Sequence, residues 1–207
     1  MNKLVPLIIS FSLLSCGVMA TTTIPDSIVV ANQVILIDED GKKRILQKYL
    51  SLTKSQKFYH EYLSQVNQSI FNVNGILSKY KLHTDLKYVA ALESHMNPKA
   101  ESRTGAKGIW QFKYDTAMEL GLIYDNADKR ECVMASTHAV AQYFMHHLDY
   151  LEEDYLKVIL AHHLGLQGTL MYMKNQRIQK LNQINKNTHI YLIHYLAHYI
   201  ALNKHFN

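Results

Sequence analysis

The spacing of apolar residues constrains this chain more than any other feature of its sequence. From Lys42 onward, apolar side chains recur at three- and four-residue intervals, which is the period of a helix buried on one face. Alternating runs rich in β-branched residues are rare, and the stretch VVANQVILI at 29–37 is the one strand candidate. The pattern predicts a mainly α protein built as a single helical domain.

The same spacing predicts where the helices lie. A second helix is expected to begin at a cap formed by Thr84 or Asp85 and to end near His95, because Pro98 disfavours helical geometry at Asn97. The long amphipathic helix before it is predicted from Tyr59, Tyr62, Leu63, Val66, Ile70, Val73, Leu77 and Tyr80. Further helices are expected after Phe112 as far as Gly121, over 135–151, over 154–163, from about 169, and over 188–204.

The first twenty residues are typical of an export signal. A lysine precedes an apolar run over 4–14, which is shorter than the roughly 20 residues that span a membrane. Two processing sites remain open: cleavage after Ala20, or lipidation of Cys16, since the preceding letters LLS complete a segment that resembles a bacterial lipobox. The sequence predicts a signal peptide at 1–20, an extended leader at 21–40 and a domain at 41–207, in a protein exported to the periplasm or cell envelope.

Charge and histidine content indicate which kinds of binding partner to expect. The formal net charge of +5 suits an anionic polymer such as a bacterial wall. Basic residues form no stripe with interleaved aromatic residues, so nucleic acid is not expected as a partner. His194 and His198 are one helical turn apart, but no H-E-x-x-H motif or nearby acidic ligand accompanies them. We therefore expect neither a metal nor a cofactor.

One carboxylate stands on the apolar side of a predicted helix. Leu86, Val89, Ala90 and Glu93 fall at i, i+3, i+4 and i+7, so Glu93 continues the apolar stripe. Loss of hydration disfavours the charged form of a carboxylate, and a protonated carboxyl group is what general-acid cleavage of a glycosidic bond requires. An idle, half-exposed Glu at a helix end is the alternative.

The residues after Glu93 favour a binding cleft. Pro98 ends the helix soon after the carboxylate, which places it at a rim instead of in the deep core. Gly105 and Gly108 permit backbone conformations that other residues avoid and allow close approach of a ligand. Trp110 adds a flat apolar surface suited to a sugar ring or to the core.

The stretch ALESHMNPKAESRTGAKGIWQF at 91–112 resembles the signature of the lytic transglycosylase domain, whose fold is related to goose-type lysozyme. That pattern is roughly E-S, a short gap with Pro, A-x-S, then G-A-x-G-[LI]-W-Q-F. The family's T-A, G-L, D-x-R and S-T elements follow in order at Thr116-Ala117, Gly121-Leu122, Asp128-x-Arg130 and Ser136-Thr137. The resemblance covers about residues 40–205, and its lead-in at 38–50 is similar to the membrane-bound lytic murein transglycosylase D branch.

The resemblance implies cleavage of the β-1,4 bond between N-acetylmuramic acid and N-acetylglucosamine in peptidoglycan. One Glu, here Glu93, protonates the leaving oxygen and then acts as base while the muramyl C6 hydroxyl closes a 1,6-anhydro ring. Because an internal hydroxyl replaces water, no second carboxylate is required. The resemblance also implies that Ser102 and Gln111 line the substrate cleft and that Trp110 supports the loop from the core side.

Two segments depart from the family's pattern. A-Y-N-x-G reads Ala161-His162-His163-Leu164-Gly165, so two imidazoles replace the Tyr and Asn that face the catalytic Glu and the sugar. E-T-x-x-Y reads Asn187-Thr188-His189-Ile190-Tyr191, which keeps the tyrosine and lacks the acid. Imidazole donates or accepts hydrogen bonds, so we predict His162, His163 and Tyr191 as substrate-binding residues.

Two functions are compatible with this sequence. The first is an exported lytic transglycosylase acting on peptidoglycan strands, for wall turnover or to open the wall for a larger assembly. The second is a binding module with weak or no catalysis, which holds glycan strands or docks on an envelope-spanning secretion or transport assembly. The stretch around Glu93 favours the enzyme, and the His162-His163 substitution favours the binding module.

Overall fold

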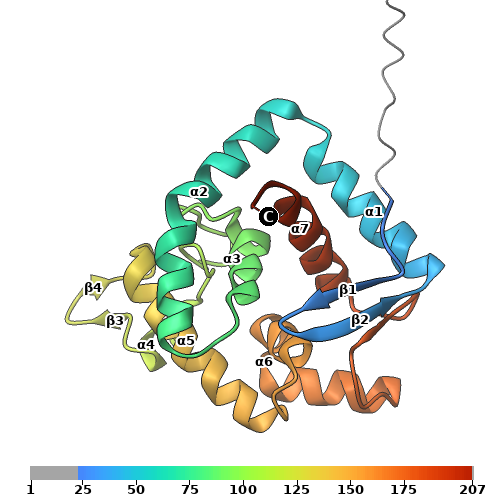
Figure 1. Ribbon diagram of the computed structural model, residues 1–207. Helices are drawn as coiled ribbons and strands as arrows, with labels where there is room; N and C mark the ends of the chain where they lie inside the picture. The colour runs from blue at the N-terminus through green and yellow to red at the C-terminus, as the bar shows by residue number, and fades with distance from the viewer. Residues whose placement is uncertain (1–22, 207) are drawn as a thin grey trace, which may run out of the picture.

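The computed structural model describes residues 23–206 and shows a mainly helical domain (Figure 1). The predicted fold class is confirmed, since seven α-helices and only short strands make up the described chain. The elements are β1 (Ser27–Val30), β2 (Gln33–Ile37), α1 (Glu39–Thr53), α2 (Gln56–Lys79), η1 (Thr84–Leu86), α3 (Lys87–Ser94), α4 (Tyr114–Glu119), β3 (Ile123–Tyr124), β4 (Ala127–Asp128), α5 (Val133–Tyr150), α6 (Tyr155–Gln176), β5 (Gln183–Ile184) and α7 (Ile190–Phe206). The expectations for 1–20, including processing at Cys16 or Ala20, lie outside the described residues.

Helix α7 lies at the centre of the fold. It packs against α1 on one side and α3 on the other, and also contacts α6 (Figure 1). Leu192, Leu196 and Ala197 of α7 are fully buried. Tyr191 of α7 donates a hydrogen bond to Glu93 of α3, so the central helix contacts the expected catalytic carboxylate. The C-terminal helix, distant in sequence, therefore completes the surroundings of the 91–112 stretch.

A small sheet covers one end of the helices. Strands β1 and β2 form an antiparallel hairpin, and β5 pairs parallel to β2. The turn residues Ala31 and Asn32 both have positive φ, of 47° and 63°, as a two-residue hairpin of this twist requires. The hairpin falls within the segment 21–40 that was predicted as an extended leader, and Val30 and Ile35 are buried in the common core.

The predicted cap of the second helix is wrong. The Asp85 carboxylate accepts a hydrogen bond from the Ala31 backbone N–H at 2.8 Å, so it fastens the hairpin turn to the helical core. The imidazole of His83 instead accepts from the Asp85 N–H at 3.2 Å and begins the short 3-10 turn. The long-range contact accounts for the difference, because spacing along the chain does not reveal it.

Helix α3 ends within one residue of the predicted end near His95, but a left-handed turn that precedes Pro98 closes it. The last helical residue is Ser94, and His95 and Met96 adopt left-handed φ values of 53° and 62°. Their N–H groups donate to the carbonyls of Ala91 and Ala90, which closes the helix C-terminus. The carboxylate of Glu93 therefore lies in the final turn.

The two predicted helices over 154–163 and from 169 form one kinked helix, α6. Gly165 within it has φ 70° and ψ 168°, values outside the helical region. Thr169 donates its hydroxyl proton to the Gly165 carbonyl at 3.0 Å, a contact that joins the kink to the following turn of the helix. The kink turns the chain immediately after His162 and His163.

Buried histidines link α7 to α2 and α3. His198 is 1% exposed, and its Nδ1 lies 2.7 Å from the Tyr62 hydroxyl on α2. The His95 ring stacks on it with 5.7 Å between ring centroids. Burial lowers the pKa of His198 well below 6.5, and the neighbouring His95, Lys48 and His194 lower it further. Burial also lowers the pKa of His95 and of His194.

Acidification is expected to destabilise the fold through these imidazoles. The unfolded chain takes up protons near pH 6.5, whereas folded His198 does so only at much lower pH. The stabilisation is thus present above about pH 6.5 and is lost as pH falls towards the folded-state pKa. His198 alone should lower the free energy of unfolding by about 1 kcal/mol between pH 7.5 and 5.5. Urea unfolding at both pH values should show a smaller pH-dependent loss in His198→Phe than in wild type or in the exposed control His60→Phe. Equal losses in all three proteins would contradict the assignment.

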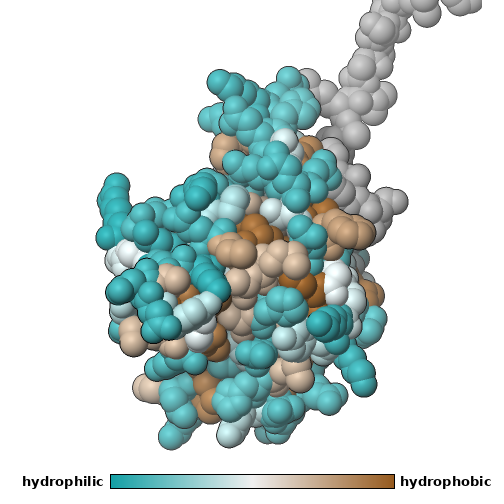
Figure 2. Space-filling model, turned by 90° about the vertical axis from the view of Figure 1, so that its left-hand side faces the viewer, coloured by the Kyte–Doolittle hydropathy of each residue, from teal (hydrophilic) through white to brown (hydrophobic). Residues whose placement is uncertain are grey.

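Figure 2 shows one face of the molecule, most of which is covered by hydrophilic residues. Hydrophobic residues gather towards the middle of that face. Within the described range 23–206, no helix combines the length and apolar character needed to cross a bilayer.

Candidate active site

A cavity of about 440 Å³ opens beside the end of α3. Five of the six residues predicted as site residues line it: Glu93, Ser102, Gln111, His162 and His163. The remaining lining residues are Thr104, Ala106, Phe112, Lys113, Thr116, Tyr143, Leu164 and Gly165. Among the described residues that line this cavity, Glu93 is the one carboxylate.

Glu93 stands where the apolar stripe of α3 meets this cavity. Leu86, Val89 and Ala90 on the same stripe are 0% exposed, while Glu93 is half-buried. The carboxylate accepts a hydrogen bond from the Tyr191 hydroxyl, with 2.6 Å between the phenol oxygen and Oε1. One carboxyl oxygen is thereby oriented by α7. No hydrogen-bond donor among the described residues contacts the second oxygen, Oε2.

Tyr191 is placed behind Glu93 and does not line the cavity. It is 6% exposed, and burial, followed by the charge and hydrogen bond of Glu93, raises its pKa well above 10. The phenol therefore remains a proton donor throughout the physiological pH range. The exposed ring of His163 stacks on it, with 4.5 Å between centroids and 12° between planes. Tyr191 thus contacts the carboxylate directly, and its role in substrate binding stays a prediction.

The loop over 97–112 forms the opposite wall. The Ser102 hydroxyl accepts from the Ala106 N–H at 3.0 Å, which folds the loop tip. Gln111 has a positive φ of 52°, and its side-chain nitrogen donates to the carbonyls of Ala100 and Gly108 at 3.1 and 2.9 Å. Both predicted cleft residues therefore shape the loop in addition to lining the cavity.

The loop is attached to the core at two further points. The Ser94 hydroxyl lies 3.1 Å from the Ala90 carbonyl and 2.9 Å from that of Ile109, so it joins the end of α3 to the returning loop. Trp110 is 0% exposed and donates its indole N–H to the Thr137 hydroxyl at 3.0 Å. Trp110 accordingly supports the loop from the core and offers no face to a sugar.

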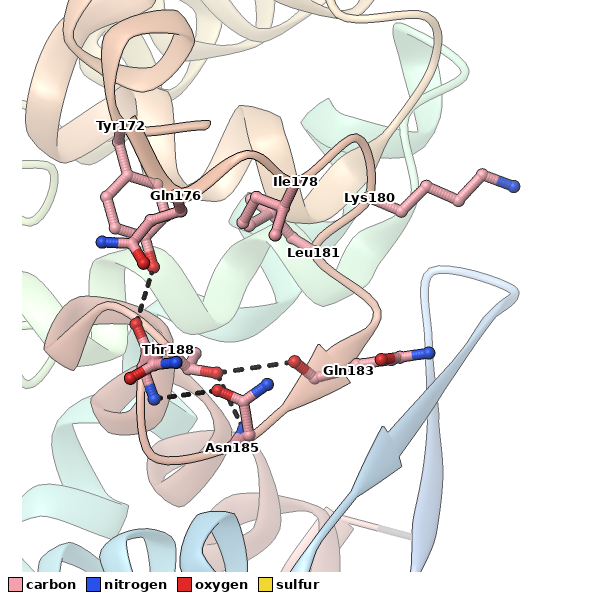
Figure 3. A pocket seen from close by; sticks show the side chains of 9 residues that line it. Tyr172, Gln176, Ile178, Lys180, Leu181, Gln183, Asn185 and Thr188 are labelled. Carbon is pink, nitrogen blue, oxygen red and sulfur yellow. Dashed lines mark hydrogen bonds between the residues drawn. The ribbon is translucent and has the colours of Figure 1, made fainter. Parts of the chain in front are cut away.

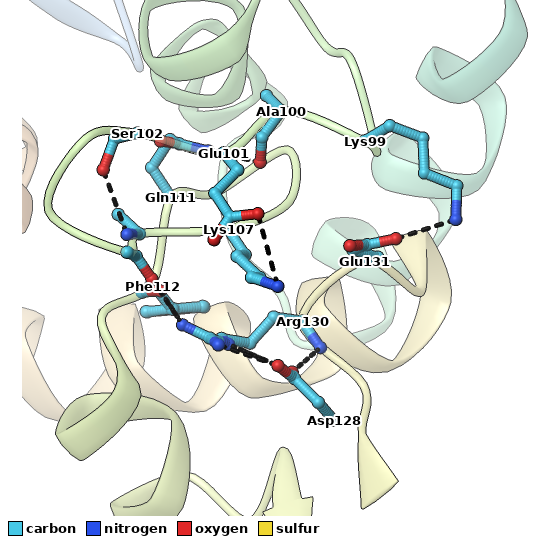
Figure 4. Close-up of polar contacts among 12 residues, drawn as sticks. Lys99, Ala100, Glu101, Ser102, Lys107, Gln111, Phe112, Asp128, Arg130 and Glu131 are labelled. Atoms are coloured by element: carbon cyan, nitrogen blue, oxygen red, sulfur yellow. Dashed lines mark hydrogen bonds and ion pairs between the residues drawn. The ribbon is translucent and has the colours of Figure 1, made fainter.

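Arg130 holds the loop through several polar contacts (Figure 4). Its guanidinium is nearly buried, at 4% exposure, and pairs with Asp128 through Nη2–Oδ2 and Nε–Oδ1 distances of 2.7 and 3.0 Å. Its Nη1 donates to the carbonyls of Gly105 and Phe112 at 2.8 and 3.1 Å. The hydrogen bond from Arg130 lowers the pKa of Asp128, so the pair stays charged at neutral pH. The D-x-R element can be recognised in the sequence, but only the fold shows which carbonyl groups Arg130 contacts.

His162 faces the loop from α6. Its Nε2 lies 3.0 Å from the Trp110 carbonyl oxygen, which only accepts, so Nε2 carries the proton. Burial lowers the pKa of His162, outweighing the opposing effects of Glu93 and the Trp110 carbonyl. His162 is therefore neutral near pH 7. It ties α6 to the loop and does not place a positive charge next to Glu93.

Tyr143 on α5 lines the cavity although the sequence did not single it out. Its hydroxyl donates to the Ala161 carbonyl at 3.1 Å and so holds the backbone that precedes His162. Burial raises the pKa of Tyr143 to about 12. A tyrosine on a long amphipathic helix has no short-range motif, and only the packing of α5 on α6 reveals this position.

A second, smaller cavity of about 110 Å³ lies where α6 ends and the β5–α7 connection begins (Figure 3). Tyr172 donates its hydroxyl proton to the Asn187 carbonyl at 3.0 Å across it. The centroid of its ring lies 5.4 Å from that of His189. The His189 ring centroid in turn lies 5.7 Å from that of His163. The cavity therefore adjoins the Glu93 site through two imidazoles, and its described lining contains amides, a lysine and hydroxyls but no carboxylate.

Within residues 23–206, no group of three or more His, Cys, Asp or Glu side chains is arranged to hold a metal ion.

Comparison with known proteins identifies the domain. Residues 71–185 match the model of the transglycosylase SLT domain. Membrane-bound lytic murein transglycosylase D of Escherichia coli strain K12 is 28% identical over 135 residues, which is 65% of this chain and 29% of that protein. Membrane-bound lytic murein transglycosylase F of Serratia proteamaculans strain 568 is 27% identical over 154 residues, or 71% of this chain and 32% of the relative.

The chain thus spans about a third of the length of these relatives. The match at 71–185 includes the Glu93 helix, the loop, the Asp128–Arg130 pair and both histidines of α6. Since the matched segment is more than half of the chain, this protein belongs to the transglycosylase SLT domain family.

Proposed function

We propose that this protein is a peptidoglycan lytic transglycosylase that cleaves the MurNAc-β-1,4-GlcNAc bond and forms 1,6-anhydro-MurNAc. One observation supports the proposal: Glu93 is the one carboxylate among the described residues that line the cavity beside α3, and it is oriented by a tyrosine. A hydrolase acting through a glycosyl-enzyme intermediate needs a pair of carboxyl groups about 5 Å apart. A single carboxyl group suffices when the attacking hydroxyl belongs to the substrate.

In the proposed reaction, protonated Glu93 gives its proton to the glycosidic oxygen as the bond to muramyl C1 breaks. The resulting carboxylate then accepts the proton of the muramyl C6 hydroxyl, whose oxygen bonds to C1. Glu93 ends protonated, so the cycle is balanced without water. Tyr191 holds one carboxyl oxygen and thereby leaves the other free for proton transfer. Ser102, Gln111 and His163 would contact the sugars from the cavity wall.

The second candidate is a glycan-binding module with weak or no catalysis. The observation that favours it is the position of His162, whose Nε2 proton is engaged by the Trp110 carbonyl and is not offered to a sugar. For either function we propose export to the periplasm or cell envelope. Attachment through Cys16 and service to an envelope-spanning assembly belong to the same proposal, since the relatives above are named as membrane-bound murein enzymes.

Digestion of purified sacculi separates the two candidates. The enzyme is expected to release muropeptides with 1,6-anhydro ends, identified by mass spectrometry from the loss of one water relative to reducing ends. Products with reducing ends would indicate hydrolysis by water. Binding to sacculi with no soluble product between pH 5 and 8 would overturn the enzymatic proposal and support the binding module.

Replacement of Tyr191 by phenylalanine is expected to lower kcat about ten- to a hundredfold. The variant removes the hydroxyl that orients Glu93 at 2.6 Å, and a hydrogen bond to a charged group contributes about 1.5–3 kcal/mol. Initial rates of anhydromuropeptide release measure the effect. The matched control is Tyr199→Phe on the same helix, whose hydroxyl donates to the distant Val29 carbonyl. Equal activity of the two variants would remove Tyr191 from the catalytic arrangement.

A further inference from the structure

A third cavity, of about 330 Å³, lies between α1 and α7. Its lining is cationic: Arg44 and Lys48 are one turn apart on α1, and His194 faces them from α7. Gln47, Ser51 and Ile190 complete the described lining. A helix packed against a neighbour normally turns apolar residues towards it, so a polar, basic stripe at this edge of the α1–α7 contact calls for an explanation.

The described residues provide no anion for these cations. No Asp or Glu is among the described side chains that line the cavity. Arg44 donates to the carbonyls of Asn185 and Lys186 at 2.8 and 3.2 Å, contacts that orient the guanidinium but leave its charge uncompensated. Burial lowers the pKa of Lys48, with no offsetting contribution from a carboxylate. After burial, the charges of Lys48 and Arg44 also lower the pKa of His194. A cavity of this kind is electrostatically complementary to an anionic ligand.

The basic cavity lies within reach of Glu93. Its α7 residue Ile190 directly precedes Tyr191, whose hydroxyl contacts the Glu93 carboxylate on another side of the same helix. The two sites thus lie on different sides of the start of α7, and a helix is roughly 10–12 Å across. On the surface, His163 of the Glu93 cavity contacts His189, the residue before Ile190. An extended peptide covers that distance with about three or four residues.

We propose that this basic cavity binds the carboxylates of the peptide that branches from the glycan strand of peptidoglycan, an inference that rests on the proposed function. The peptide is attached to the muramyl residue, so it emerges beside the bond that Glu93 cleaves. Its free carboxylates match Arg44 and Lys48, and its backbone amides match Gln47 and Ser51. The size of the cavity and the apolar contact at Ile190 fit a peptide better than a lone phosphate ion.

Binding measurements with Glu93→Gln, which should hold glycans without cutting them, test this inference. Isothermal titration calorimetry would compare glycan strands that carry stem peptides with the same strands stripped of peptides by an amidase. We expect the peptide-bearing strands to bind about tenfold more tightly in low salt, with a smaller advantage at high ionic strength. The free stem tetrapeptide and inorganic phosphate are titrated separately. The tetrapeptide should bind measurably and phosphate should not compete with it at equal concentration.

Charge substitutions on α1 test which residues bind the peptide carboxylates. Lys48→Glu in the Glu93→Gln protein is expected to abolish the peptide-dependent advantage and leave the affinity for stripped strands unchanged. Lys48→Gln, a milder change, should reduce the advantage several-fold. Lys43→Glu is the matched control, because Lys43 is exposed on the same helix and lies 3.7 Å from Asp40. Thermal unfolding verifies that each variant is folded.

The outcomes separate this inference from the proposed function. Equal binding of both kinds of strand by Glu93→Gln would overturn the peptide site and leave glycan cleavage untouched. An advantage that persists in Lys48→Glu, or is lost equally in Lys43→Glu, would also overturn it. If neither kind of strand binds and sacculi yield no product, the proposed function fails. In that case the titration with free tetrapeptide tests the peptide site by itself. Binding that is lost in Lys48→Glu supports the site, and binding that is absent or unchanged in Lys48→Glu overturns it.

Discussion

Replacement of Glu93 by glutamine is expected to lower the release of anhydromuropeptides by a factor between about 10² and 10⁴, the range typical of a lost general acid–base group. The amide keeps the shape of the side chain and can still accept the Tyr191 hydrogen bond at 2.6 Å. It has no acidic proton to give to the glycosidic oxygen. Stability should change by less than about 1 kcal/mol, since the hydrogen bond to Tyr191 is retained in weaker form. Initial rates on purified sacculi and urea unfolding measure the two effects.

Glu101→Gln provides the matched control for this prediction. Glu101 lies in the loop eight positions further on, pairs with Lys107 at 3.4 Å and is exposed. The same chemical change there removes a surface ion pair, which contributes about 0–1 kcal/mol, and should leave the rate within about twofold of wild type. Retention of full activity by Glu93→Gln, or equal loss in both variants, would show that Glu93 is not the acid–base group.

The sequence was sufficient for the fold class and for five of the residues that line the cavity, because both depend on local patterns. The three- and four-residue spacing predicts helices, and the 91–112 stretch groups Glu93, Ser102 and Gln111 within twenty residues. The hydrogen bond from Tyr191 to Glu93 joins residues 98 positions apart, and its length follows from how α7 packs on α3. The family pattern points to Tyr191 as a site residue, but only the packed structure shows that its hydroxyl contacts the Glu93 carboxylate.

The wrongly predicted cap of the second helix, and the unexpected cause of its end, have a related explanation. Thr84 and Asp85 look like a cap in sequence, yet Asp85 binds the hairpin turn at Ala31, 54 positions away. Pro98 looks like the stop of α3, yet His95 and Met96 already leave helical geometry in positive φ. In both places a tertiary contact or a strained backbone overrides a local preference, as is common next to a functional site. The early end of α3 keeps Glu93 in its last turn, beside the cavity.

Gly108→Ala is expected to destabilise the protein by about 3 kcal/mol or more and to abolish most of its activity. Gly108 has φ +78°, and an added Cβ would lie 2.0 Å from the Arg130 carbonyl oxygen, closer than any real contact. The left-handed conformation costs a non-glycine residue about 1–2 kcal/mol, and forced overpacking adds about 1–3 kcal/mol. The clash must move either the loop or the Arg130 segment, and Arg130 holds the carbonyls of Gly105 and Phe112.

Gly105→Ala isolates the steric part of this effect. Gly105 has a nearly identical φ of +76°, but an added Cβ there would meet no atom within 4 Å. It should therefore show only the backbone cost of about 1–2 kcal/mol and retain most activity. Urea unfolding and anhydromuropeptide release, measured on both variants, give the comparison. A loss in Gly105→Ala as large as that in Gly108→Ala would mean that backbone strain, and not the contact with Arg130, limits this loop. The larger loss at Gly108 alone would establish that close packing of the loop against the Arg130 segment keeps Ser102 and Gln111 facing Glu93.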